Sequence, residues 1–182
     1  MAKRISLRDF QQNLSERLIS ARRGETGQAL LGIESGEGEL PGGSHWLLDL
    51  TDAGEVAPLP PLMAAPLTKP WFVGIANIRG ALYGVVDFSA WRGGAPTPHN
   101  AQARLLLIGA RHGNNCALLV RRALGLRPQL QMQPVPTPAS RVAASYAGNW
   151  LGGCFIDAQG VSWTQLCIPA LLADPSYLDI AI

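Results

Sequence analysis

Residues 72–88 constrain the fold of this chain more than any other segment. Their sequence, FVGIANIRGALYGVVDF, consists of two apolar runs on either side of Arg79-Gly80. Glycine readily adopts the positive φ that a tight turn requires, so the pattern predicts a β-hairpin with its turn at Arg79-Gly80. Both alternating sets of side chains are largely apolar, which indicates strands covered on both faces. We therefore expect this hairpin deep in a barrel or between two packed layers.

The rest of the chain is typical of a strand-rich domain with many turns. Its 182 residues include 20 glycines and 14 prolines, 47% are hydrophobic and 15% are charged, which excludes a disordered chain and favours short elements. Prolines throughout residues 58–70 predict a connection without ladder pairing. Eight to ten short strands are expected, among them 29–33, 45–50 and 54–56, with hairpins that pair 104–108 with 116–120 and 153–157 with 161–165.

Helices are expected at the two ends of the chain. An S-x-x-D start at Ser6 and an apolar stripe at helical spacing predict a helix over about 7–22, within an amphipathic extension at 1–24. This stripe either packs on the same domain or docks on a partner. Pro169 is expected to open a short helix that ends near Leu172, and residues 176–182 are expected to form a tail.

Charge and cysteine content narrow the class of protein. The formal net charge is +2, which provides no overall nucleic-acid footprint. No apolar run approaches the roughly 18 residues that a membrane-spanning helix needs, so no membrane span is expected. Cys116, Cys154 and Cys167 are odd in number and widely spaced, which predicts no disulfide framework and a reduced, cytoplasmic setting.

Patterns that carry catalysis or bind a cofactor are absent or incomplete. Gly36-Glu37-Gly38 begins like a dinucleotide-binding loop, but Pro41 occupies the place of the third glycine. The three histidines share no metal-ligand spacing with one another or with a cysteine. We therefore predict no catalytic residue, no metal site, no cofactor and no enzymatic activity.

The segment Lys69–Phe88 resembles the signature of the CheW family of chemotaxis adaptors. Its centre is Gly74-Ile75-Ala76-Asn77-Ile78-Arg79-Gly80, and the following strand ends in Asp87-Phe88. The upstream Gly54-Glu55-Val56 is similar to the glutamate–aliphatic pair of that family. The resemblance extends more faintly from Ala29 to Leu172.

The resemblance implies a mainly β fold of two interlinked, five-stranded SH3-like β-barrels with a groove at their junction. The CheW-like domain would span 25–175, with a crossing loop between the two subdomains near 92–103. Members of the family couple the cytoplasmic tip of a chemoreceptor to a CheA-like histidine kinase. A non-catalytic adaptor in receptor arrays at the inner membrane is therefore expected.

The resemblance also assigns candidate partner-binding residues. Glu55 and Val56 would lie near the partner-binding surface, whereas Asn77, Arg79 and Gly80 would form the turn that shapes the groove. Arg79 alternatively ties the two barrels together. For Asp87 we expect a structural role, in which its side chain caps the turn that follows at residues 89–90.

One departure from the family pattern points to a subgroup. Arg121 stands where the family usually has an aspartate, and the N-terminal extension is an addition. These features resemble the PilI-type members, which serve chemosensory systems that control type IV pilus twitching motility. Two alternatives stay open: a structural component of the pilus machinery that docks through its N-terminal helix, and a small-molecule-binding or cysteine-dependent β-barrel enzyme.

Overall fold

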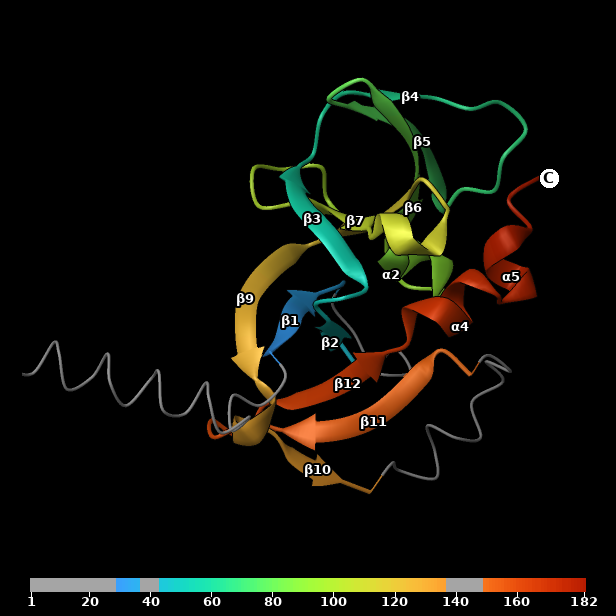
Figure 1. Ribbon diagram of the computed structural model, residues 1–182. Coiled ribbons are helices and arrows are strands. Elements are labelled where there is room, and N and C mark those ends of the chain that lie inside the picture. Colours follow the sequence, from blue (N-terminus) through green and yellow to red (C-terminus); the bar gives the residue numbers. More distant parts are fainter. Residues whose placement is uncertain (1–28, 37–42, 137–148) are drawn as a thin grey trace, which may run out of the picture.

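In the described part of the chain, twelve strands form two six-stranded sheets, an upper and a lower one in Figure 1. The computed structural model describes residues 29–36, 43–136 and 149–182, so the helix expected at 7–22 lies outside the described residues. The order of the lower sheet is β10 (Gln133–Val135), β11 (Leu151–Ile156), β12 (Ser162–Leu166), β2 (His45–Asp49), β1 (Ala29–Glu34), β9 (Arg122–Pro128). The order of the upper sheet is β3 (Ala53–Pro58), β7 (Arg104–Ile108), β8 (Cys116–Val120), β6 (Ala81–Asp87), β5 (Phe72–Ile78), β4 (Leu62–Met63).

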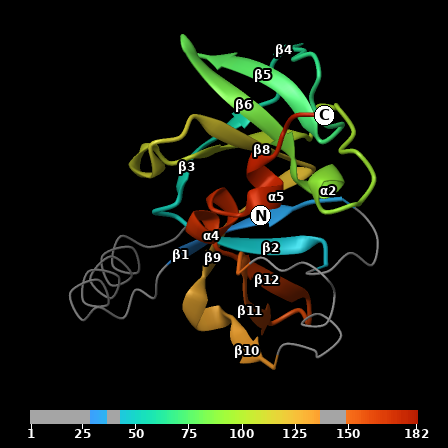
Figure 2. The same ribbon diagram turned by 90° about the vertical axis from the view of Figure 1, so that its right-hand side faces the viewer.

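The described helices are short, and α2 (Phe88–Trp91), α4 (Ile168–Leu172) and α5 (Pro175–Leu178) lie near the place where the two sheets meet. Figures 1 and 2 show α4 and α5 beside this junction, between the upper strands and β2. The helices of the described residues are α2 (Phe88–Trp91), η1 (Ala110–His112), η2 (Gln129–Gln131), α4 (Ile168–Leu172) and α5 (Pro175–Leu178). The helix expected to open near Pro169 is confirmed as α4.

Three clusters of buried side chains explain the long apolar runs. Side chains alternate between the two faces of a strand, and in β7 both sets are buried. Leu105 and Leu107 join a cluster belonging to the upper sheet, whereas Leu106 and Ile108 join a larger cluster contributed by both sheets. A third, smaller cluster belongs to the lower sheet. Because a fully buried leucine contributes about 1.5–3 kcal/mol, the shared cluster binds the sheets into one body.

The three predicted hairpins are confirmed. β5 pairs with β6, β7 with β8, and β11 with β12, each antiparallel. The hairpin β5–β6 also joins β8 through a parallel pairing with β6. This pairing covers the half of the hairpin that leads into α2, while the turn at its other end is exposed.

Two features of the expected barrels are wrong. Each sheet contains six strands rather than five, and in the described residues the strand order of each sheet is open, without a closing pair. The sixth strand of the upper sheet is β4, which lies inside the proline-rich segment expected to lack pairing. Leu62 and Met63 retain their backbone N–H groups and pair with Ala76 and Ile75 at the sheet edge, where neighbouring prolines are tolerated.

The chain passes between the sheets at places other than the expected crossing loop. Residues 92–103 connect α2 to β7, and the strands on either side, β6 and β7, both belong to the upper sheet. The crossings occur between β2 and β3 and between β8 and β9, where Arg121 alone separates two strands. A crossing at a single bent residue, Arg121, or in the short turn at residues 50–52 leaves no long glycine- or proline-rich loop as a signal.

The C-terminal residues also contact the connection between β4 and β5 of the upper sheet. Ala181 forms an isolated antiparallel bridge with Thr68, and the Lys69 ammonium lies 2.6 Å from an Asp179 carboxylate oxygen. Residues expected to form a tail therefore lie against the segment between β4 and β5.

Candidate partner-binding surface

The turn between β5 and β6 has the backbone that the sequence predicts. Arg79 has φ 52° and Gly80 has φ 86°, and positive φ at both central residues is the mark of a type I′ hairpin turn. The side-chain oxygen of Asn77 accepts a hydrogen bond of 2.9 Å from the Gly80 amide. The turn is stiff because of this backbone and hydrogen bond. It is accessible because Asn77, Arg79 and Gly80 are all exposed.

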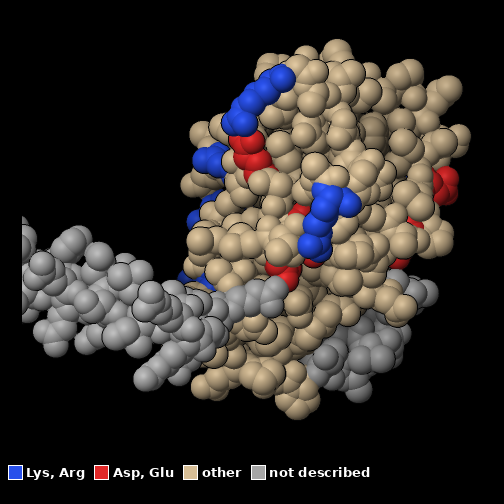
Figure 3. All heavy atoms as spheres, viewed as in Figure 1, with Lys and Arg blue, Asp and Glu red and all other residues tan. Residues whose placement is uncertain are grey.

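Arg79 forms a bidentate ion pair with Glu55 of β3. Its Nη1 donates to Oε2 at 3.0 Å and its Nη2 to Oε1 at 2.7 Å. Both residues belong to the upper sheet, so the alternative in which Arg79 ties two barrels together has no support in its described contacts. The pair is accessible, with 78% of the Arg79 side chain and 37% of the Glu55 side chain exposed. Figure 3, viewed as in Figure 1, shows charged side chains in small groups among uncharged residues.

Stability alone does not explain why an arginine occupies position 79. A positive φ costs a side-chain-bearing residue roughly 1–2 kcal/mol relative to the right-handed region, and exposed ion pairs return only about 0.2–1 kcal/mol. The described ion pair uses two of the roughly five N–H donors of the guanidinium. A fixed guanidinium with donors remaining is suited to bidentate recognition of a carboxylate or carbonyl group on another protein, at little ordering cost.

Val56 has a different environment from its neighbour Glu55. It is half-buried, lies opposite Leu106 in the β3–β7 ladder and packs against the core shared by the two sheets. Alternation along β3 therefore turns Glu55 outward and Val56 inward. The expected role of Val56 in binding a partner stays a prediction, and its described contacts are those of a core residue.

Asp87 caps α2, as the sequence predicts. One carboxylate oxygen accepts hydrogen bonds from the amides of Ser89 at 3.0 Å and Ala90 at 3.2 Å. The other accepts from the amide of Thr97 at 2.6 Å, a contact that the sequence did not indicate. Asp87 is buried, and it fixes the segment that follows the hairpin.

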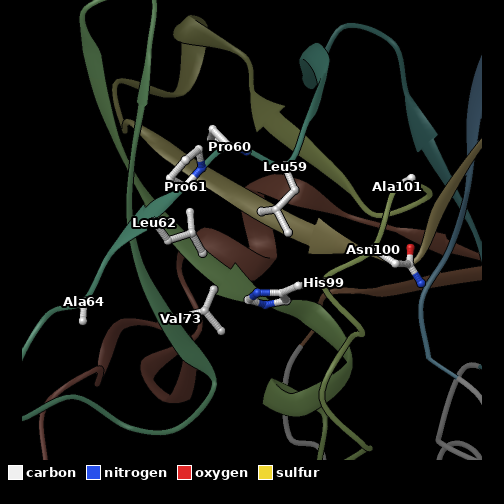
Figure 4. Close-up of a pocket in the computed structure, with 9 residues that line it drawn as sticks. All are labelled: Leu59, Pro60, Pro61, Leu62, Ala64, Val73, His99, Asn100 and Ala101. Atoms are coloured by element: carbon white, nitrogen blue, oxygen red, sulfur yellow. The ribbon is translucent and has the colours of Figure 1, made fainter.

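Two hollows lie away from the predicted site residues. The larger, of about 730 Å³, opens at the end of the upper sheet and is lined by Leu59, Pro60, Pro61, Leu62, Ala64, Val73, His99, Asn100 and Ala101 (Figure 4). A smaller hollow of about 150 Å³ is lined by Gly36, Ala95, Pro96, Pro98 and Arg121, from segments that flank the junction of the sheets. Neither is lined by Glu55, Val56 or the residues of the β5–β6 turn.

The environment of Cys116 disfavours its thiolate form. Burial raises the pKa of the Cys116 thiol above its ordinary value, against the opposing effect of a hydrogen bond with Tyr177. Burial also raises the pKa of Tyr177, and the adjacent Cys116 adds to this shift. A thiol with a raised pKa forms little of the reactive thiolate.

Within the described ranges, neither a metal-binding cluster nor a membrane-spanning helix is present. There, no group of three or more histidine, cysteine, aspartate or glutamate side chains is arranged to hold a metal ion. In the same residues, no helix has the length and apolar character needed to cross a bilayer.

A comparison with protein families decides how this fold is classified. The model of the CheW-like domain matches residues 41–176, about three quarters of the chain, including the Glu55–Arg79 pair. The chain belongs to the CheW-like domain family. It is 28% identical over 151 residues to Protein PilI of Pseudomonas aeruginosa. This match covers 81% of this chain and 80% of PilI.

A solved member of the same fold supports the architecture. The crystal structure of the scaffolding protein TtCheW from Thermoanaerobacter tengcongensis matches with a TM-score of 0.63 at 16% identity. The match covers 85% of this CheW-like chain and 97% of TtCheW. The two-sheet arrangement is therefore the CheW fold, and the predicted family is confirmed.

Proposed function

We propose that this CheW-like protein is a non-catalytic adaptor that couples the cytoplasmic tip of a chemoreceptor to a CheA-like histidine kinase. The observation that carries the proposal is the match of residues 41–176 to the CheW-like domain, which includes the Glu55–Arg79 surface. Similarity to PilI over most of both chains favours a chemosensory system that controls type IV pilus twitching motility. The protein would then work on the cytoplasmic side of the inner membrane, in receptor arrays.

The first proposed binding surface is the exposed turn with its ion pair. Glu55 and Arg79 hold each other in one geometry before a partner arrives, which lowers the entropy lost on binding. Asn77 and Gly80 set the backbone that presents the guanidinium. The five residues assigned by the resemblance thus divide into four at this surface and one, Val56, that supports it from the core.

A coupling protein also needs a second surface that the first partner leaves open. Leu126, at the end of β9, is 62% exposed, and Leu130 in the adjacent η2 is 74% exposed. β9 is the terminal strand of the lower sheet, whereas the Glu55–Arg79 pair belongs to the upper sheet. These two leucines lie four residues apart in adjoining elements, and we propose that they contact the second partner.

Binding measurements with purified partners test the proposal. The receptor's helical hairpin tip and the regulatory domain of the CheA-like kinase are titrated separately into the full chain by calorimetry. We expect saturable binding of each at micromolar concentration. Leu126→Asp should weaken binding of one partner and Arg79→Ala that of the other, whereas Leu178→Asp, an exposed leucine outside both surfaces, should weaken neither. Folded protein that binds neither partner would contradict the proposal.

The N-terminal segment distinguishes the adaptor from a structural pilus component. An adaptor that binds through its two sheets keeps receptor and kinase binding after deletion of residues 1–23. A component that docks through an N-terminal helix loses its interactions in the same deletion. Circular dichroism of the shortened chain verifies that the sheets are still folded.

A further inference from the structure

Arg92 is a charged residue completely enclosed at the junction of the two sheets. It follows α2 directly and is only 1% exposed. Its guanidinium carbon lies 4.6 Å from the ring centroid of Trp46 and 5.0 Å from that of Phe88. Its Nη1 donates to the carbonyl of Gly43 at 3.0 Å. Trp46 belongs to the lower sheet and Gly43 leads into it, whereas Phe88 follows the upper sheet, so Arg92 contacts both halves.

The surroundings of Arg92 are a continuous group of aromatic rings. The rings of Phe88 and Trp46 meet edge-on with their centroids 5.1 Å apart, and the ring centroids of Trp91 and Trp150 are 5.0 Å apart. Further pairs join the same rings to one another, and Trp91 to Tyr177 of α5. The rings come from β2, α2, α5 and the residue before β11, and most belong to the shared core. The junction is therefore packed by rigid groups with preferred geometries.

A second close contact between the two sheets involves Gly36 and Ser89, the neighbour of Phe88. Gly36, which follows β1, has φ 40°, and a Cβ there would overlap the hydroxyl of Ser89 in α2. The backbone at the end of β1 thus lies directly against the Ser89 side chain at the start of α2. A small change in the angle between the sheets would move these two segments apart or make them clash.

Burying an arginine is a poor way to gain stability. Desolvating its charge costs several kcal/mol, roughly what its interactions return, and replacing a buried charged group by an apolar one of similar volume is often neutral or stabilising. Methionine at position 92 would fill the same space without that cost. A planar guanidinium, however, stacks on ring faces and donates in fixed directions. Directional contacts restrain an angle more tightly than apolar packing does.

We propose that Arg92 is a positioning residue that fixes the angle between the two sheets. It thereby sets the distance and direction from the Glu55–Arg79 surface on the upper sheet to the Leu126/Leu130 surface on the lower sheet. A receptor and a kinase that are held by an array present their sites in a fixed geometry. Arg92 then matters for binding both at once, and this last step rests on the proposed adaptor function.

The test compares Arg92→Met and Arg92→Lys with the unaltered chain. Residual dipolar couplings of backbone amides report the orientation of one sheet relative to the other, and urea titration reports stability. We expect a changed or broadened orientation in both variants, because a lysine ammonium is not a planar fork. The urea midpoint should stay equal or rise in Arg92→Met. Arg127→Met is the matched control, since Arg127 stacks on Trp163 at 5.2 Å within the lower sheet alone.

Binding supplies a second readout. Each partner alone should bind Arg92→Met within about twofold of the unaltered chain. The affinity for the kinase domain in the presence of a receptor array should fall about tenfold, an ordinary coupling between two sites. Arg127→Met should show neither effect.

Unchanged dipolar couplings in Arg92→Met would overturn the proposal, and so would loss of the folded state in both Arg92 variants, which would make Arg92 a stability residue. If the couplings change but the unaltered chain binds neither partner, the positioning role stands and the adaptor function fails.

Discussion

The bidentate ion pair between Arg79 and Glu55 joins the β5–β6 turn to β3, two parts of the upper sheet that have no backbone pairing with each other. In the sheet order β7 and β8 lie between β3 and the hairpin β5–β6, yet Arg79 Nη2 and Glu55 Oε1 are 2.7 Å apart. The sheet curls far enough to bring its first strand to the hairpin turn (Figure 1). Side chains rather than a strand ladder make this closure, so the exposed pair is a contact of the fold, and we propose that it also binds a partner.

Replacing Arg79 by alanine separates these two roles. The exposed ion pair contributes about 0.2–1 kcal/mol, so the free energy of unfolding should fall by no more than about 1 kcal/mol. Binding of the partner at this surface should weaken about tenfold, because hydrogen bonds to charged groups contribute about 1.5–3 kcal/mol. Urea titration and calorimetry measure the two quantities. Lys69→Ala, which removes an ion pair with Asp179 beside the connection from β4 to β5, should leave binding unchanged.

Exchanging the two charges gives a sharper comparison. The double variant Glu55→Arg with Arg79→Glu restores an ion pair within the chain but reverses the charges presented to a partner. We expect it to regain the stability lost in Arg79→Ala without regaining binding. Full recovery of binding would mean that the pair acts only inside the chain.

Two glycines of the signature hairpin should differ in their sensitivity to alanine. Gly80 has φ 86° with open space around the position of a Cβ, so Gly80→Ala should cost only the backbone strain, about 1 kcal/mol. Gly74 has φ 129°, and a Cβ there would overlap the backbone carbonyl of Met63 in β4. Gly74→Ala should therefore destabilise the chain clearly more and detach β4. Denaturation midpoints and amide exchange of residues 62–63 check both expectations, and equal losses for the two variants would contradict them.

The dependence of stability on acid should include a contribution from Asp157. Partial desolvation tends to raise the pKa of this carboxyl, but hydrogen bonds from the Trp163 indole and the amides of Val161 and Gln159 outweigh it, aided by Arg127. The pKa is thereby lowered below its ordinary value of 3.8. A lowered folded-state pKa stabilises the fold above the unfolded value, and this stabilisation is lost as pH falls through the folded-state value.

Asp157→Asn removes that titration. Its unfolding free energy should fall less steeply than that of the unaltered chain as pH decreases below about 4. Unfolding measured by fluorescence between neutral and strongly acidic pH gives both slopes. Identical slopes would show that Asp157 does not titrate with folding.

Chemical labelling addresses the cysteine-dependent alternative. Because burial raises the pKa of Cys116, its alkylation by iodoacetamide at neutral pH should be slower than that of free cysteine. Cys116→Ala should keep binding of both partners within about twofold. Rapid alkylation that abolishes a measurable conversion of a substrate would instead support an enzyme.

The strands that the sequence predicted best are those with one dominant signal. The turn at Arg79-Gly80 was predictable because glycine tolerates the positive φ that few other residues adopt. The strand β7 was predictable because both of its faces are buried, which requires a continuous apolar run. By contrast, β4 was missed because its pairing depends on β5 and not on its own two residues. β9 was missed because an edge strand with exposed, charged positions has no clear alternation.

The site was predictable residue by residue but not as an arrangement. Glu55 and Arg79 were both identified, yet nothing in their spacing indicates that they pair, since the contact depends on how the sheet curls. Arg92 gave no signal, because an arginine after a short helix is ordinarily solvated, and only packing of both sheets encloses it. Val56 was placed beside Glu55 by resemblance, whereas strand alternation turns it toward the core.

Sedimentation velocity on a mixture of the full chain, the receptor hairpin and the kinase regulatory domain tests the adaptor function most directly. We expect one species that contains all three components, and we expect each pair that contains this chain to form at micromolar concentration. We also expect receptor and kinase domain without this chain to sediment separately. Competition between receptor and kinase for the chain, or the absence of any complex while the chain is folded, would contradict the adaptor function.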